Sequence, residues 1–146
     1  MADKAGIVHR KPSRDLDIDE ALIALFIGAM NANHHVAREE LARAHHLIWS
    51  TRRFRRKSGE TVGRLIDRMK RQLEEQDPEA VIESAARAVP ARLRAPAFAV
   101  IADLLLADGK IDPRERKFLQ RLAADFRMPA RLATTVVDGM LLKNRL

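Results

Sequence analysis

The sequence predicts an all-α fold of about seven helices. The chain of 146 residues is rich in Ala, Leu, Arg and Glu and has one Trp and no Tyr, a balance that favours helix over sheet. Apolar residues recur at helical spacing, and no segment shows the alternation of a strand. Cap and stop residues separate the helical segments. We therefore expect one helical domain over residues 15–146, preceded by a flexible N-terminal arm over residues 1–14.

The first expected helix begins near Asp15 or Asp17, where acidic side chains suit the positive end of the helix dipole, and covers residues 18–32. Every residue over 21–30 is apolar or Gly, so this helix is expected to be buried on most sides. A second helix over about 38–49 follows a polar break and has one apolar face.

A polar, basic connection over residues 50–59 leads to a third helix over about 60–76, with Ser58 as its expected N-cap. Asp77-Pro78 then combines a cap residue with Pro at the first helical position. This pair predicts a fourth helix over about 79–89.

Pro90 ends the fourth helix, and residues 91–95 are expected to connect it, as a loop or as a helical turn, to an almost entirely apolar helix at about 96–107. Gly109 supplies the turn after that helix. The tetrapeptide 112–115 fits a capping box with Pro at the first helical position, which predicts a sixth helix ending near residue 126.

A seventh helix is expected to open at Met128-Pro129, because Pro suits a helix start. Its inward-facing residues are expected to be Leu132, Val136, Met140 and Leu141.

A shift of 75 residues overlays the fifth helix on the first. Each of these helices is followed by the same order of features: a small residue, an Asx, a turn, an apolar residue and a Glu. The aligned pairs include Ala24 with Ala99, Asn33 with Asp108, and Glu40 with Glu115. This pattern predicts two pseudo-repeated helical hairpins whose apolar helices pack together at the centre, a hypothesis that requires the first and fifth helices to touch.

Several classes of protein are disfavoured by the composition. The chain has no Cys, which excludes disulfides, thiolate zinc sites and cysteine nucleophiles. It also lacks P-loop, GxGxxG, GxSxG and HExxH motifs, so we expect no enzyme. Residues 1–19 have no apolar core of a signal peptide, and the apolar run around 98–106 is too short to span a bilayer. A cytoplasmic protein is expected.

The positive charge is concentrated in one segment. Residues 52–71 hold nine Lys or Arg against Glu60 and Asp67, which equals the net charge of +7 of the whole chain. The candidate anion- or partner-binding residues are Arg52, Arg53, Arg55, Arg56, Lys57, Arg64, Arg68 and Arg71. A nucleic acid, an anionic membrane surface or an acidic protein would meet this segment. Nucleic acid is disfavoured because Phe54 is the only interleaved aromatic residue, and a plain solvated surface is the alternative.

The turn between the fifth and sixth helices is the candidate metal site. Hard cations such as Ca²⁺ and Mg²⁺ prefer several oxygen ligands on a bent backbone. The candidate ligands are Asp108, Asp112 and Glu115, with Asp103 and Glu40 as residues that could complete the site. The same residues also have an explanation without metal, since Asp112 and Glu115 suit a capping box and the charge of Asp103 suits an ion pair with an Arg.

The stretch 107–115, the following residues 119–124 and the earlier run 90–94 resemble the tellurite-resistance TerB family. The resemblance covers about residues 21–140. It implies an all-α domain with an internal repeat and an acidic site thought to bind a divalent metal. It also implies a place in bacterial stress or tellurite-resistance systems associated with the membrane.

By this resemblance, Asp108 and Glu115 match the acidic positions of the second repeat, and Glu40 matches in the first. The expected function is a non-enzymatic TerB-like module that binds a divalent cation weakly and docks protein partners, in the cytoplasm or peripheral to the inner membrane. A homo-oligomer is left open. The alternative function is a binder of an anionic partner through residues 52–71.

Overall fold

The computed structural model describes residues 15–32 and 45–146, and within these ranges the chain is helical with turns and no β-strand. The helices are α1 (Ile18–Ala32), α3 (Gly59–Glu75), α4 (Pro78–Ala88), α5 (Ala91–Leu105), α6 (Pro113–Asp125) and α7 (Ala130–Lys143). Residues 45–50 are also helical. The all-α prediction is confirmed, whereas the expected N-terminal arm and the first part of the expected second helix lie outside the described residues.

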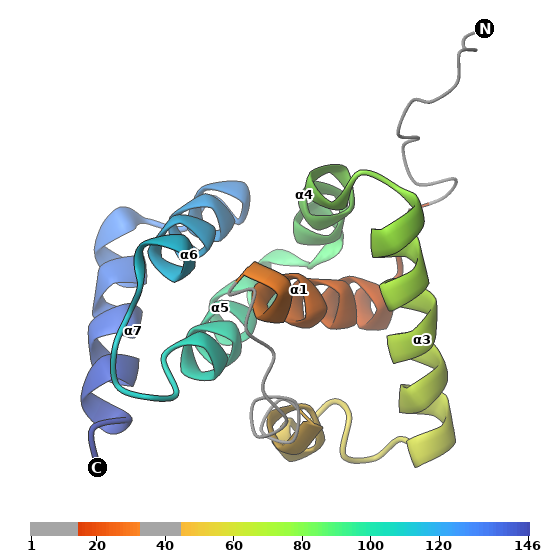
Figure 1. The fold of residues 1–146 in the computed structure, drawn as a ribbon, viewed down its shortest axis with the longest axis horizontal. Coiled ribbons are helices and arrows are strands. Elements are labelled where there is room, and N and C mark those ends of the chain that lie inside the picture. Colours follow the sequence, from red (N-terminus) through yellow and green to blue (C-terminus); the bar gives the residue numbers. More distant parts are fainter. Residues whose placement is uncertain (1–14, 33–44) are drawn as a thin grey trace, which may run out of the picture.

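Helix α1 is the centre of the fold, and α3, α4, α5 and α6 all contact it (Figure 1). Its residues from Glu20 to Ile27 are all buried, as its unbroken apolar sequence predicts. The closest approach is to α4, where a Cβ built on Gly28 would lie 2.2 Å from Ile82 Cδ1. A small residue at this position therefore lets the two helices pack tightly.

Helix α5 is the second central helix. It contacts α1, α6 and α7, so the contact required by the two-hairpin hypothesis is present. The side chains of Ala97, Phe98, Ile101, Ala102 and Leu105 are buried along its inner face. The two apolar helices of the predicted hairpins thus share one core.

The helix starts follow the predicted caps. Ser58 Oγ accepts from Thr61 N at 3.1 Å, Asp77 Oδ1 from Glu79 N at 3.3 Å, and Asp112 Oδ1 from Glu115 N at 2.8 Å. These bonds satisfy backbone donors that a helix leaves free in its first turn. Local sequence therefore determines where three of the helices begin.

Helix α5 begins at Ala91 rather than at Pro96 as predicted, so Pro96 lies inside the helix. Proline has no N–H, so Pro96 cannot donate to the carbonyl of Arg92 as an ordinary residue of the helix would. The start of the helix is held from outside by Arg94, because its Nε donates to the Val89 carbonyl at 2.9 Å and its Nη1 to the Phe126 carbonyl at 3.4 Å. Of the two expectations for residues 91–95, the helical turn is the one observed, and it continues directly into the rest of α5.

Helix α7 is peripheral, and none of its residues is fully buried. Val136, Met140 and Leu141 pack against the core as predicted, but Leu132 is 40% exposed, so its predicted inward position is wrong. The reason is that α7 rests mainly on α5, which leaves the side of α7 carrying Leu132 uncovered. None of the helices in the described part of the chain is both long and apolar enough to cross a bilayer.

Candidate functional site

Residues 51–57 form a compact turn, here named the basic turn, between residues 45–50 and α3. Arg55 N donates to the Thr51 carbonyl at 3.1 Å, and Lys57 N donates to the Phe54 carbonyl at 3.0 Å. Phe54 is 1% exposed and belongs to the hydrophobic core. The turn is therefore fixed by its own backbone bonds and by one apolar side chain.

Two cations of the basic turn are neutralised by α1. Arg53 Nε and Lys57 Nζ both contact the Asp19 carboxylate, Lys57 at 3.0 Å. Burial on its own raises the pKa of Asp19, but the hydrogen bonds and charges of Arg53 and Lys57 outweigh burial and hold that pKa below its usual value. These contacts tie the basic turn to the start of α1.

Two cations on α3 also have carboxylate partners. Arg68 Nη1 lies 3.0 Å from Oε2 of Glu20, whose side chain is completely buried. Arg64 pairs with Glu60 one turn earlier on the same helix, and both of these side chains are 72% exposed. Of the two pairs, only that of Arg68 connects separate helices.

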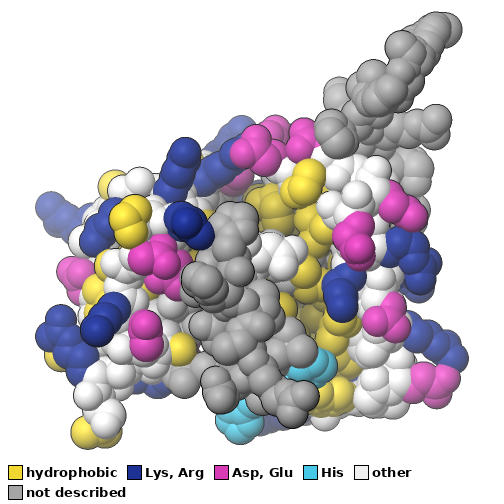
Figure 2. All heavy atoms as spheres, viewed as in Figure 1, with side chains coloured by type: hydrophobic (Ala, Val, Ile, Leu, Met, Phe, Trp, Pro, Cys, Tyr) yellow, Lys and Arg dark blue, Asp and Glu magenta, His cyan; other side chains and the backbone are white. Residues whose placement is uncertain are grey.

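The predicted basic segment therefore divides into two groups. Arg53, Lys57, Arg64 and Arg68 are paired, whereas Arg52, Arg55, Arg56 and Arg71 are exposed and have no ion pair within residues 15–32 and 45–146. On the face shown in Figure 2, cationic side chains alternate with acidic ones along the outer edge of α3. The basic turn, by contrast, carries three unpaired arginines within five residues, Arg52–Arg56.

Asp103, a candidate metal ligand, pairs with Lys143 and Asn144 at the end of α7 rather than with an Arg. Its Oδ1 accepts from Lys143 Nζ at 3.1 Å and from Asn144 Nδ2 at 2.9 Å, and its Oδ2 lies 3.2 Å from the same Nζ. The side chain of Asp103 is only 14% exposed. Its buried charge is thus compensated by a cation and an amide of the chain itself.

The turn after α5 is closed by local bonds. Asp108 is exposed, and its Oδ1 accepts from Lys110 N at 3.2 Å. Gly109 has a φ of +77°, as the predicted turn requires, and a Cβ built there would lie 3.1 Å from the Asn144 carbonyl oxygen. The turn and the chain after α7 therefore pack together.

Asp112 and Glu115 form the predicted capping box. Glu115 Oε1 accepts from Asp112 N at 3.0 Å, and Glu115 is only 5% exposed. Glu40, the proposed ligand from the first repeat, lies outside the described residues. No three His, Asp or Glu side chains of the described ranges are grouped closely enough to hold a metal ion. Binding of a divalent cation by these carboxylates, with Glu40 completing the site, stays a prediction.

That prediction has a direct test. If Ca²⁺ or Mg²⁺ binds only the folded state, a concentration one hundred times the Kd should add about 2.7 kcal/mol to the free energy of unfolding of metal-stripped protein. Asp108→Asn should abolish this gain, whereas Asp138→Asn, which changes an exposed carboxylate on α7, should keep it. Thermal melts with Ca²⁺, Mg²⁺, Mn²⁺ and Zn²⁺ measure the effect, and an unchanged melt with every ion would leave the turn with its capping role only.

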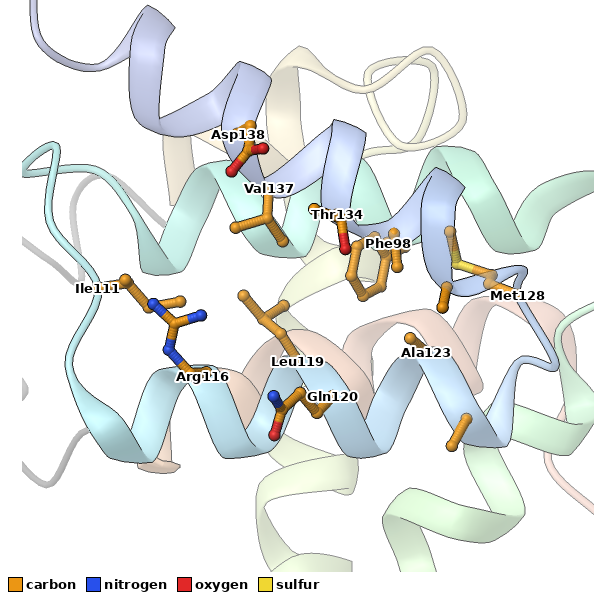
Figure 3. Close-up of a pocket in the computed structure, with 13 residues that line it drawn as sticks. Phe98, Ile111, Arg116, Leu119, Gln120, Ala123, Met128, Thr134, Val137 and Asp138 are labelled. Atoms are coloured by element: carbon orange, nitrogen blue, oxygen red, sulfur yellow. The ribbon is translucent and has the colours of Figure 1, made fainter.

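Among the hollows formed by the described residues, two are apolar grooves between helices. The larger one, of about 410 Å³, separates α6 from α7 and has Phe98 of α5 at its floor (Figure 3). Leu119 and Val137 point into it from its two sides, while Arg116 and Asp138 face each other across one end. Its rim therefore carries both signs of charge.

The second groove, here named the α1–α5 groove, has a volume of about 280 Å³ and lies beside the basic turn. Its lining residues are Leu22, Phe26, Thr51, Arg52, Arg53, Phe54, Leu93, Pro96, Ala97 and Val100. Sequence reasoning missed both grooves. Their walls come from helices far apart in the chain, and periodicity marks an apolar face without showing which part of it stays uncovered.

Comparison with protein families identifies the family of the chain. The model of the family described as tellurite resistance protein TerB matches residues 19–135, a range that includes both the basic turn and the turn at Asp108–Glu115, here named the acidic turn. No curated protein and no solved structure matches the chain. Lys143 and Asn144, the partners of Asp103, lie beyond the matched range.

Proposed function

The chain belongs to the tellurite resistance protein TerB family, and we propose that it acts as a non-enzymatic helical module whose basic turn binds an anionic partner. One observation carries this proposal. Arg52, Arg55 and Arg56 are exposed and unpaired within the described residues, on a turn whose backbone is fixed by Phe54. Stress or tellurite resistance is the expected context of the module.

A fixed turn favours binding for a physical reason. A flexible basic loop loses conformational entropy when it binds, whereas a turn that is already ordered loses less. The pairing of Arg53 and Lys57 with Asp19 adds to this order and leaves the other three guanidinium groups directed to solvent. Guanidinium groups bind carboxylates and phosphates through two parallel hydrogen bonds, which suits an anionic partner.

Cation binding at the acidic turn has less support. Each of its described carboxylates already accepts hydrogen bonds from the chain, and Asp103 also has a cation beside it. A metal ion would have to compete with these bonds or recruit further ligands. Anion binding needs no such rearrangement.

The double variant Arg55→Glu/Arg56→Glu tests the proposed function. It should weaken binding to heparin or anionic vesicles at least about tenfold, because two contacts become repulsive and fewer counterions are released. Arg114→Glu/Lys117→Glu makes the same change in net charge at exposed positions of α6 and should have a much smaller effect. Equal losses in the two variants would mean that net charge alone matters, and no loss in the first would overturn the proposal.

Asp19→Asn should act on stability and on binding in opposite directions. It removes the carboxylate that holds Arg53 and Lys57, so the variant should melt at a lower temperature at pH 7 and bind heparin more tightly. The pKa of Asp19 is lowered in the folded state, so its stabilisation is present above about pH 4 and is lost as the pH falls through the folded pKa. Melts from pH 7 to pH 2 should therefore show the two proteins converging in acid, and a constant difference would contradict this assignment.

A further inference from the structure

The α1–α5 groove and the basic turn form one continuous surface. Arg52 and Phe54 belong to both, since they line the groove and are part of the turn. The α5 wall consists of Leu93, Pro96, Ala97 and Val100, which fall on one helical face. An apolar hollow thus opens directly beside the unpaired guanidinium group of Arg52, on the turn that also carries Arg55 and Arg56.

The size of the groove limits what it can hold. Sites for small molecules and cofactors usually have volumes of roughly 300–1,000 Å³, and this groove, at about 280 Å³, lies just below that range. A volume of this kind suits one large side chain, and such anchors supply much of the affinity of protein interfaces. The groove is therefore better matched to an anchor residue of a peptide than to a complete cofactor.

The free charge on the groove lining is positive. Its charged lining residues in the described ranges are Arg52 and Arg53, of which Arg53 pairs with Asp19 and Arg52 has no ion pair, and no Asp or Glu lines the groove. Arg92 is also exposed and lies one helical turn before Pro96, on the same face of α5. The α6–α7 groove differs, because Arg116 and Asp138 give its rim both signs. Of these two grooves, the α1–α5 groove is therefore the one whose lining has no acidic residue and the one better suited to a negatively charged partner.

We propose that the anionic partner is an acidic protein segment that places a Phe or Leu side chain in the α1–α5 groove and its carboxylates on the basic turn. This inference rests on the proposed function and names the class of partner. The apolar anchor supplies affinity through burial, and Arg52, Arg55 and Arg56 select for flanking Asp and Glu residues. A nucleic acid offers no aliphatic or benzyl anchor of this kind, and its phosphates would use only the basic turn.

The test uses two synthetic peptides that are rich in Asp and Glu and differ only at a central residue, which is Phe in one and Ala in the other. The full chain should bind the Phe peptide about tenfold or more tightly than the Ala peptide, as expected for burial of an aromatic side chain. Fluorescence anisotropy of labelled peptides measures both dissociation constants. Equal affinities would overturn the inference and leave the proposed function intact.

A pair of matched variants locates the anchor. Val100→Trp fills the α1–α5 groove, and Val137→Trp makes the same substitution in the α6–α7 groove at another partly buried position (Figure 3). The first variant should remove the preference for Phe over Ala and keep the affinity for the Ala peptide, whereas the second should change neither. A preference for Phe that survives in Val100→Trp would overturn the inference.

Further outcomes separate the two proposals. Retention on anionic vesicles or heparin without binding to either peptide would overturn the acidic-segment inference and support the basic turn alone. Absence of binding to every anionic probe would overturn both.

If Val100→Trp melts far below the native chain, Pro96→Glu replaces it, because Pro96 is exposed at the groove rim and a carboxylate there should repel the acidic peptide. Unchanged affinity for the Phe peptide in Pro96→Glu would also overturn the inference.

Discussion

Replacing Phe54 with Ala is expected to lower the free energy of unfolding by about 3–5 kcal/mol. The side chain is 1% exposed and is the only apolar one in the basic turn, whose other residues are Thr, Arg and Lys. Removing the ring takes away its burial and leaves a cavity that the fixed turn can close only in part. Urea denaturation followed by circular dichroism measures the loss.

Phe118→Ala is the matched control, because Phe118 packs against the same core but is only partly buried. Its loss should be clearly smaller, since less apolar area leaves water when it folds. Equal losses in the free energy of unfolding would contradict the prediction that the Phe54 side chain anchors the basic turn in the core. The Phe54 variant should also bind heparin less tightly, because its turn is less ordered before binding.

Local sequence determined much of the fold. Ser58, Asp77 and Asp112 cap helices where they were expected to, since a cap depends on residues two or three positions apart. Pro96 shows where a local rule failed. Proline favours a helix boundary, but bonds from Arg94 to Val89 and to Phe126 hold the first turn of α5 in place. Phe126 lies 32 residues away from Arg94, beyond the reach of a pattern search.

The candidate site was predictable only in part. The basic segment is visible in the sequence, yet its division into paired and unpaired residues is not. Arg53 meets Asp19 across 34 residues, and Arg68 meets Glu20 across 48. Which cations remain available depends on the packing of α1 against α3, because that packing brings the acidic start of α1 to them. The charge of the sequence therefore identifies the basic segment, whereas the tertiary contacts determine which of its cations are unpaired.

Replacing Arg68 with Ala is expected to lower the free energy of unfolding by about 2–3 kcal/mol. Glu20 is fully buried, and Arg68 lies 3.0 Å from its Oε2. Glu20 Oε1 keeps a hydrogen bond from Asp17 N, and the Arg68 side chain is 50% exposed, so the loss should be below the about 3–5 kcal/mol typical of a fully buried pair. Urea denaturation at pH 7 measures it.

Arg64→Ala supplies the matched control on the same helix, because its pair with Glu60 is exposed and should contribute only about 0.3–0.5 kcal/mol. Arg68→Met separates charge from packing, since it keeps an apolar stem and removes the cation. If the pair with Glu20 is what matters, Arg68→Met should be nearly as destabilising as Arg68→Ala. A Met variant as stable as the native chain would show that Arg68 contributes through its aliphatic stem and not through its ion pair with Glu20. In that case the guanidinium group of Arg68 would also be available to an anionic partner.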